Sequence, residues 1–357
     1  MYHYQYLYDF TTQLFEKIGC SKEDATVVAE LLVGAELRNI PSHGFLRIPD
    51  YIKMWEAGRI KTNPNISVVR ETLSTVVIDA DSCFGMIAAK KAMNLAIEKA
   101  KTVGTCWIAI KNSTHFGIAG YYAMMALEHD MIGIAMTNAN PLVAPTFSID
   151  KMLGTNPFAV AIPTQNQPPF VADFATTPIA RGKLDLMGKK GLKAPLGFVQ
   201  DKDGNPSTNP DILKQGGAIL PLGGDYEHGS HKGYCMGAIV DIFSSVFSGA
   251  NFGPFVPPQV PYLAVKAEST GEGLGHFLGA MQIDAFQDAD VFKSQMDNWI
   301  TTFRNSKPAE GQEKVLIPGD PERESEISKK RDGIVLLPSL EEDIKQIATK
   351  YGLEFKA

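Results

Sequence analysis

The stretch CWIAIKNSTHFGIAGYYAMMALEHDMIGIAMTNAN, residues 106–140, carries the pattern that sets the fold class of this chain. It opens with the short apolar run CWIAI, continues through the helical segment GYYAMMALEHD and reaches a second apolar run, MIGIAMT. Apolar runs of this length, bounded by turn-forming residues, are typical of buried strands. A strand, a helix and a strand in succession predict a protein of the mixed α and β class.

Similar runs lie on both sides of this stretch. Four more segments are expected to be strands: STVVIDAD, FAVAIPT, FVADFAT and, late in the chain, GHFLGAMQIDAF. Residues 1–60, KGYCMGAIVDIFSSVFSGA and LPSLEEDIKQIATKYG have helical spacing, and Ser21 is a good helix start. Residues 305–333 are expected to be a charged loop, and GKKGLKAPLGFVQDKDGNPSTNPD a surface loop with a turn at DKDGNP. The predicted fold class is α/β, with helices gathered at both ends of the chain.

Composition excludes several classes of function. Of the 357 residues, 44% are hydrophobic and 21% are charged, and the net charge of −6 argues against a nucleic acid or an anionic membrane as partner. No apolar run is long enough to cross a bilayer, and the N-terminal segment lacks the features of a signal peptide. The four cysteines form no CxxC pair, which favours reduced thiols and a cytoplasmic location.

The usual nucleotide-binding fingerprints are missing from the sequence. No GxGxxG follows a predicted strand, and no GxxxxGK[ST] occurs. The run GEGLGHFLG has the wrong spacing and precedes a strand instead of a helix. An ordinary Rossmann domain is therefore disfavoured, and any dinucleotide must be bound by another motif.

The segment IPSHGFLRIPDYIKMW, residues 40–55, places polar side chains on one face of a predicted helix. His43, Arg47 and Tyr51 are spaced at i, i+4 and i+8, where a packing helix would have apolar residues. Pro49 is expected to bend or interrupt this helix. The alternative to a functional site is a solvated helix face, or, for Tyr51, a packed aromatic ring.

A second polar group follows the strand CWIAI, in the sequence KNSTHFG. Polar side chains at the end of a strand are a common way to display catalytic groups. His115 is the candidate here, with Asn112 and Ser113 expected to orient it. Asn138 and Asn140 leave the next predicted strand, where they either bind a ligand or form the turn before a proline.

Further along the chain, Asp173 interrupts an apolar strand and needs a partner if it is buried. Arg181 is a candidate for that partner. His228 and His231 do not suggest a metal site, because no third ligand accompanies them. Lys232 precedes a helix expected to begin near Tyr234, and it could meet an anion at that helix start.

Six motifs in order along nearly the whole chain resemble the type-2 malate/L-lactate dehydrogenase family. They are SHGFLRIPDY, NSTHFGIAGYYA, TNANPLVAPT, GTNPFAVAIPT, DFATTPIARGK and HKGYCMGAIVDIFSSVFSGA. The resemblance implies a fold that is not of the Rossmann type, a small 2-hydroxy or 2-oxo acid as substrate, NAD or NADP as cofactor, no metal, and a homodimer. Members act on malate, lactate, sulfolactate, ureidoglycolate, diketogulonate or cyclic imines.

The family motifs also imply roles for individual residues. They place conserved residues of the family at His43, Arg47 and His115. The chemistry of these side chains assigns catalysis to the two histidines, with His115 favoured as the base, and the substrate carboxylate to Arg47. Tyr51, on the same stripe, is expected to line the pocket or to be a packed aromatic. Ala139 replaces a serine that many relatives carry, so any nucleotide contact from that side chain is lost. Together with the strand-end residue Asn138, the residues expected to bind the cofactor are Asp173, Phe174, Ala175, Lys232, Pro318, Gly319 and Asp320.

The expected activity is that of an NAD(P)-dependent malate dehydrogenase. Oxidising a 2-hydroxy acid needs a base for the hydroxyl proton, a cation for the carboxylate and a nicotinamide for the hydride. The alternatives are a lactate or ureidoglycolate-type dehydrogenase, a cyclic-imine reductase and a non-catalytic dinucleotide-binding protein. NAD is favoured over NADP. The expected domains are residues 1–118 with 285–357, for substrate binding and dimerisation, and residues 119–284, for the cofactor.

Overall fold

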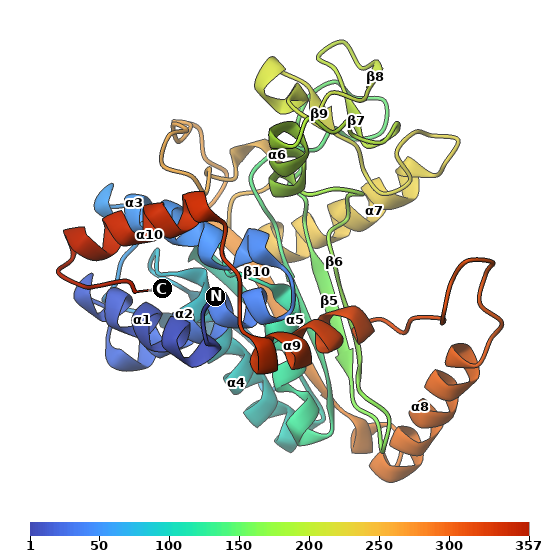
Figure 1. Ribbon diagram of the computed structural model, residues 1–357. Coiled ribbons are helices and arrows are strands. Elements are labelled where there is room, and N and C mark those ends of the chain that lie inside the picture. Colours follow the sequence, from blue (N-terminus) through green and yellow to red (C-terminus); the bar gives the residue numbers. More distant parts are fainter. Residues whose placement is uncertain (357) are drawn as a thin grey trace.

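A seven-stranded mixed sheet forms the centre of the protein in the computed structural model, which describes residues 1–356 (Figure 1). Its strand order is β1-β2-β3-β10-β4-β5-β6, and every neighbouring pair is antiparallel except β2 and β3. This mixed sheet confirms the α/β class and differs from the parallel sheet of a Rossmann domain. The strands are β1 (Ser67–Glu71), β2 (Thr75–Asp79), β3 (Thr105–Ser113), β4 (Met131–Thr137), β5 (Phe158–Ile162), β6 (Phe170–Phe174) and β10 (Leu274–Gln282).

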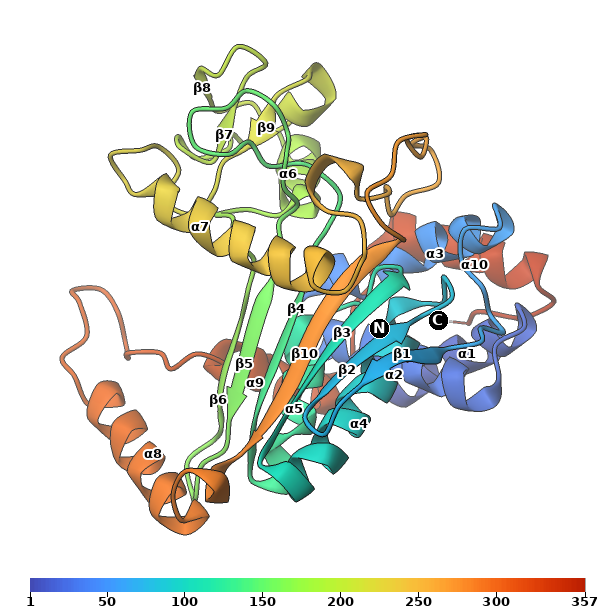
Figure 2. The same cartoon turned by 180° about the vertical axis from the view of Figure 1, so that it is seen from behind.

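Helices cover both faces of this sheet (Figure 2). On one face lie α4 (Gly85–Val103) and α5 (Ala119–Met125). On the other face lies α7 (Ser230–Asp241), which continues into a π-helical turn, η5 (Ile242–Val246). Alternate side chains of β3 point to opposite faces, as strand geometry requires. Cys106 and Ile108 enter the large core beneath α4, whereas Ala109 packs with Phe277 on the side of α7.

The two ends of the chain pack together. Helix α2 (Lys22–Leu37), which follows α1 (Tyr4–Lys17), contacts α9 (Asp320–Asp332), and α10 (Pro338–Lys350) contacts α3 (Ile48–Glu56). The Ser21 side chain caps α2 by accepting from the Asp24 amide at 3.1 Å. Tyr2 and Ile334 exchange two backbone hydrogen bonds of 2.9 and 2.8 Å. The N-terminal and C-terminal segments therefore stabilise each other.

The expectation of a loop over residues 305–333 is wrong for its second half. Residues Asp320–Asp332 form helix α9. Its sequence, DPERESEISKKRD, has almost no apolar residue, so hydrophobic spacing could not reveal it. Acidic residues occupy its first turn and basic residues its last, an arrangement that the helix dipole favours. A further helix, α8 (Ala289–Arg304), extends from one end of the sheet.

A smaller unit lies above the main sheet (Figure 1). It holds the short strands β7 (Val199–Gln200), β8 (Pro206–Ser207) and β9 (Ala218–Ile219), together with α6 (Arg181–Lys189). The predicted turn at DKDGNP is present, with Asp201 accepting from the amides of Asp203 and Asn205, both at 2.9 Å. The unit has its own apolar core, formed by Val143, Leu153, Ile179, Leu184, Ala194, Val199, Ile212 and Ile219.

The main sheet draws strands from both of the expected domains. β1, β2 and β3 come from residues 1–118, and β4, β5, β6 and β10 come from residues 119–284. The division of the chain at these boundaries stays a prediction. In the described part of the chain, no helix combines the length and the apolar character that crossing a membrane requires.

Close packing of α5 on β4 depends on a glycine. A Cβ atom at Gly133 would lie 2.0 Å from the carbonyl oxygen of Ala123, which belongs to α5. No side-chain rotation can relieve a clash with backbone. The helix can rest on the sheet at this distance only because residue 133 has no side chain.

We expect Gly133→Ala to lower the free energy of unfolding by about 2–3 kcal/mol, because it overpacks a rigid contact. Gly34→Ala is the matched control, since a Cβ at Gly34 meets nothing within 4 Å and the residue lies inside α2. That control should raise the free energy by roughly 0.5–1 kcal/mol through helix propensity. Urea unfolding followed by circular dichroism measures both. Equal midpoints for the two variants would contradict the packing argument.

Candidate active site

The segment around His43 is not the continuous helix that its spacing predicted. Two 3-10 turns, η1 (Pro41–His43) and η2 (Phe45–Arg47), precede helix α3 (Ile48–Glu56). The chain turns at Gly44, where a Cβ would lie 2.3 Å from the Glu36 carboxylate. Glu36 also accepts from the Phe45 amide at 2.8 Å. This buried carboxylate explains the break, and Pro49 occupies the first turn of α3 without interrupting it.

The turns nevertheless bring the predicted residues together. The Tyr51 hydroxyl lies 2.7 Å from His115 Nδ1, and the rings of His43 and His115 stack with centroids 5.2 Å apart. Arg47 donates from Nε to the Ser42 carbonyl at 2.8 Å, which holds its guanidinium beside the two rings. Both histidines are half-buried, so each keeps an accessible edge.

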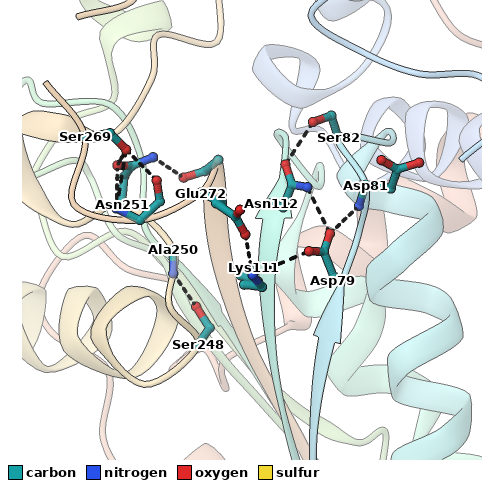
Figure 3. A network of polar contacts seen from close by, with 12 residues as sticks. Asp79, Asp81, Ser82, Lys111, Asn112, Ser248, Ala250, Asn251, Ser269 and Glu272 are labelled. Atoms are coloured by element: carbon teal, nitrogen blue, oxygen red, sulfur yellow. Dashed lines mark hydrogen bonds and ion pairs between the residues drawn. The ribbon is translucent and has the colours of Figure 1, made fainter. Parts of the chain in front are cut away.

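Asn112 and Ser113 do not orient His115, contrary to the expectation. Asn112 donates to Asp79 at 2.9 Å and accepts from the Ser82 hydroxyl at 2.9 Å, within a polar network that also contains Lys111 and Glu272 (Figure 3). This network fastens the end of β3 to its neighbours. The residues that do contact His115 are Tyr51, the Gly117 amide at 3.3 Å from Nδ1, and Gln259, whose side chain accepts from the His115 amide at 2.9 Å.

A third histidine, His276 on β10, bonds the ends of the two neighbouring strands that lead into the site. It is fully buried, with Ser113 Oγ 2.7 Å from Nε2 and Thr137 Oγ1 2.7 Å from Nδ1. Both ring nitrogens of the neutral His276 are therefore hydrogen-bonded to buried hydroxyls, one nitrogen as donor and the other as acceptor. The ring also stacks on Phe116, at 4.6 Å. Sequence reasoning missed His276, although a single histidine in the apolar strand GHFLGAMQ was a visible signal.

Burial and charge keep the histidines of the site neutral. Burial, with a smaller contribution from Arg47, lowers the pKa of His43 to about 3. Burial, then Arg47 and the neighbouring histidines, lowers the pKa of His115 well below its usual value. Burial alone, opposed by backbone hydrogen bonds, lowers the pKa of His276 to about 3. Two neutral imidazoles beside a guanidinium can accept a proton from an anionic ligand.

Two of the segments expected to bind the cofactor lie side by side. The Val171 amide on β6 donates to the Pro318 carbonyl at 3.1 Å, which places Pro318–Asp320 against the strand that carries Asp173. Phe174 is exposed and Ala175 half-buried. Burial would raise the pKa of Asp320, but hydrogen bonds from the Ile317 amide and from two arginines hold it below its usual value. The Asp320 carboxylate is thus engaged within the protein.

The expected pairing of Asp173 with Arg181 is wrong. Asp173 is exposed, and it accepts from the Gly120 amide at 2.8 Å. The Arg181 guanidinium instead bonds the Tyr262 hydroxyl and lies 3.6 Å from Asp185. These contacts direct Arg181 toward the loop that contains Tyr262 and away from Asp173.

The remaining cofactor candidates flank α7. That helix begins at Ser230, earlier than expected, so the exposed Lys232 lies in its first turn. His228 is bonded to Asp225. At the other end of the helix, the Asn138 side chain is fully buried and all its polar groups are bonded, to Asp241, the Asn251 carbonyl and the Gly275 amide. Asn138 therefore joins β4, α7 and β10.

Comparison with known proteins places the chain in one family. Residues 2–345 match the family model described as malate/L-lactate dehydrogenase. The chain is 37% identical over 349 residues to a malate dehydrogenase of Pyrococcus abyssi, which covers 98% of this chain and 94% of the relative. It is 38% identical over 343 residues to an L-sulfolactate dehydrogenase of Methanocaldococcus jannaschii, with 96% and 95% covered.

A solved structure extends this likeness to the fold. The crystal structure of malate dehydrogenase from Entamoeba histolytica superposes with a TM-score of 0.93 at 32% identity and covers 100% of this chain and 99% of that one. The match spans the mixed sheet, the terminal helices and the small upper unit alike. The chain therefore belongs to the malate/L-lactate dehydrogenase family, a family of NAD(P)-dependent oxidoreductases that act on small 2-hydroxy acids.

Proposed function

We propose that the protein is an NAD-dependent malate dehydrogenase that interconverts (S)-malate and oxaloacetate. The observation that carries the proposal is the stacking of His43 and His115, with Arg47 close enough to lower the pKa of both rings. The three groups supply a proton acceptor and a carboxylate-binding cation at the same place. The malate dehydrogenase of P. abyssi, similar over nearly the whole chain, supports malate as the acid.

Each side chain of the site has a role in the reaction that its chemistry suits. Arg47 binds the substrate carboxylate, because its planar fork matches both oxygens. His115 takes the hydroxyl proton at Nε2, the ring nitrogen that has no partner among the described residues. For Nε2 to act as the base, Nδ1 must carry the ring proton and donate it to the Tyr51 hydroxyl at 2.7 Å; the longer contact of 3.3 Å, in which the Gly117 amide donates to Nδ1, is then given up. The nicotinamide, when bound, accepts the hydride.

His43 is the second proton-transfer candidate. Ser42 Oγ lies 3.0 Å from its Nδ1, and its ring covers one face of His115. If His115 acts as the base, His43 binds or polarises the substrate oxygen. We propose these roles for the two histidines. In the alternative, His43 is the base and His115 binds the substrate, and the variants described below distinguish the two.

The residues around α7 fit a dinucleotide. The helix start has no side-chain cap, and Lys232 lies in its first turn. Nδ1 of the adjacent His231 is buried without a hydrogen-bond partner in the described chain. A helix dipole and a cation at an uncapped helix start together suit a pyrophosphate. We propose that the dinucleotide site is lined by Asp173, Phe174, Ala175, Lys232 and Pro318–Asp320. Asn138 instead holds β4 against α7.

We infer NAD as the cofactor in preference to NADP. The Asp173 carboxylate lies among the proposed nucleotide-binding residues, and a 2′-phosphate would bring further negative charge near it. We also infer a homodimer. The supporting observation is a group of exposed apolar side chains on α7 and η5, a surface that a second copy would cover: Ile239, Ile242, Phe243, Val246 and Phe247.

The alternatives are other reactions of the same site. A lactate or ureidoglycolate-type dehydrogenase would use the same base and arginine. A cyclic-imine reductase would use the same arginine, but its substrate lacks a hydroxyl group. A non-catalytic binding protein would bind NADH without turnover, and the accessible histidine edges make this the weakest alternative.

NADH oxidation at 340 nm should therefore be fastest with oxaloacetate. Pyruvate, a ureidoglycolate-derived 2-oxo acid and a cyclic imino acid serve as competing substrates in the same assay, each with NADH and with NADPH. Faster turnover of the cyclic imine would replace the malate proposal by the reductase. NADH binding without turnover of any acid would favour the non-catalytic alternative.

The two histidines should differ in how their loss affects the rate. His115→Asn should lower kcat for oxaloacetate by roughly 10²–10⁴-fold, the usual contribution of a general acid–base group. His43→Asn should raise KM as well, because it removes a group that touches the substrate. The opposite pattern would assign the proton transfer to His43. Thermal midpoints of both variants serve as the folding control.

The pH dependence of malate oxidation should follow from the lowered histidine pKa values. Oxidation requires a neutral imidazole, and this form predominates at every pH above the lowered pKa. Hence kcat/KM for malate should stay level from pH 8 down to about 6.5, the ordinary histidine pKa, and fall only below it. Oxaloacetate reduction requires the protonated form and should become faster as the pH falls. A malate profile already halved at pH 7 would contradict this.

Tyr51→Phe separates an effect on His115 from direct substrate binding. The variant keeps the ring but loses the hydroxyl that lies 2.7 Å from His115 Nδ1. We expect kcat to fall about tenfold, the loss of one hydrogen bond in a buried site, with KM within twofold of the original. A raised KM with unchanged kcat would mean that the hydroxyl contacts the substrate itself.

A further inference from the structure

The start of helix α6 touches the turn that carries His43. Gly182, the second residue of the helix, is so close that a Cβ there would lie 3.4 Å from the Ser42 Cβ. Ser42 is the residue whose hydroxyl lies 3.0 Å from His43 Nδ1. Although α6 belongs to the small upper unit, its first turn thus forms part of the wall around the histidine pair.

Arg181, the first residue of α6, extends the positive charge of the site. The Asp50 carboxylate on α3 lies 3.9 Å from Arg47. Burial raises the pKa of Asp50, and the charges of Arg47 and Arg181 oppose that rise. The charge of Arg181, on the upper unit, is therefore felt at the carboxylate that Arg47 contacts.

A single loop connects Arg181 to His115. Gln259 accepts from the His115 amide at 2.9 Å, and three residues later the Tyr262 hydroxyl bonds the Arg181 guanidinium, which also lies 5.7 Å from the Tyr262 ring centre. Arg59 anchors this loop by donating to the carbonyls of Pro258, Val260 and Leu263. The same short segment thus positions both His115 and Arg181.

The Arg181 guanidinium keeps capacity for a ligand. Of its five N–H groups, one bonds Tyr262 and another faces Asp185 at the long distance of 3.6 Å. Its side chain remains 35% exposed. The charged groups that act on Asp50 and Arg181 are Arg47, Lys53 and Arg181 against Asp50 and Asp185, so cations are in excess. An anion at Arg47 and a second anion at Arg181 would both be attracted.

We propose that Arg181 binds the distal anionic group of the substrate, while Arg47 binds the carboxylate next to the reacting carbon. The preferred substrates are then 2-hydroxy acids with two anionic ends, either a four-carbon dicarboxylate or a three-carbon carboxylate with a sulfonate. Lactate and pyruvate lack the second anionic group, so Arg181 does not strengthen their binding. This inference rests on the proposed 2-hydroxy-acid dehydrogenase activity and assigns its substrate class.

Steady-state kinetics with three 2-oxo acids test the inference. Oxaloacetate and 3-sulfopyruvate carry the second anion, and pyruvate does not. Arg181→Gln should lower kcat/KM for the two dianions by about 10- to 100-fold, mainly through KM, as expected for a lost charge-assisted contact. The value for pyruvate should change less than threefold. Arg181→Lys, which keeps the charge but not the fork, should retain part of the preference.

Lys190→Gln is the matched control for net charge. Lys190 is exposed and lies at the opposite end of α6, so its loss should leave the ratio of oxaloacetate to pyruvate unchanged. Thermal midpoints of all variants establish that they fold. A larger loss for one of the dianions identifies it as the acid that Arg181 fits best.

Two results would overturn the assignment of Arg181. An equal loss for pyruvate and the dianions would mean that Arg181 acts on the fold of the site, and an unchanged ratio would mean that it does not meet the substrate. Failure of the original protein to reduce any 2-oxo acid with either cofactor is a separate result. It would remove the proposed function, and the inference with it.

Discussion

The insertion of β10 between β3 and β4 is the constraint on which the site depends. His276 on β10 bonds Ser113, the last residue of β3, and Thr137, the last residue of β4, which is 139 residues away in the chain. Both hydroxyls are buried, and leaving either without a partner would be costly. The bonds therefore align the two strand ends, and the loops that follow them carry His115 and Asn138 in a fixed relation.

The electrostatic state of the site follows from the burial of its two imidazole rings. Burial, reinforced by the Arg47 guanidinium, keeps His43 and His115 neutral, since a charged imidazole there would be poorly solvated and would add a second positive charge. A carboxylate bound at Arg47 would cancel that repulsion and raise the imidazole pKa values. Substrate binding would thus prepare the same rings to receive a proton. Arg181, brought in by the upper unit, would extend this effect to a second anion.

Some of this organisation could be predicted from the sequence and some could not. The strands and the terminal helices were visible because apolar periodicity is a local property. Helix α9 was not, since its stability comes from charge order and tertiary packing. The break at Gly44 depends on the Glu36 carboxylate, which approaches from α2, and the partners assigned to His115 and Asp173 were wrong because nearness in sequence was taken for nearness in space.

By itself, the sequence determined the fold class and the chemistry present: two histidines and an arginine in motifs that resemble one family. Those properties belong to residue types and to short-range patterns. Only the tertiary structure decided that Tyr51 bonds His115 across 64 residues, that His276 joins two strand ends, and that the start of α6 packs against Ser42. Contacts between distant segments, and the pKa values that burial sets, arise when the chain packs, so no local pattern encodes them.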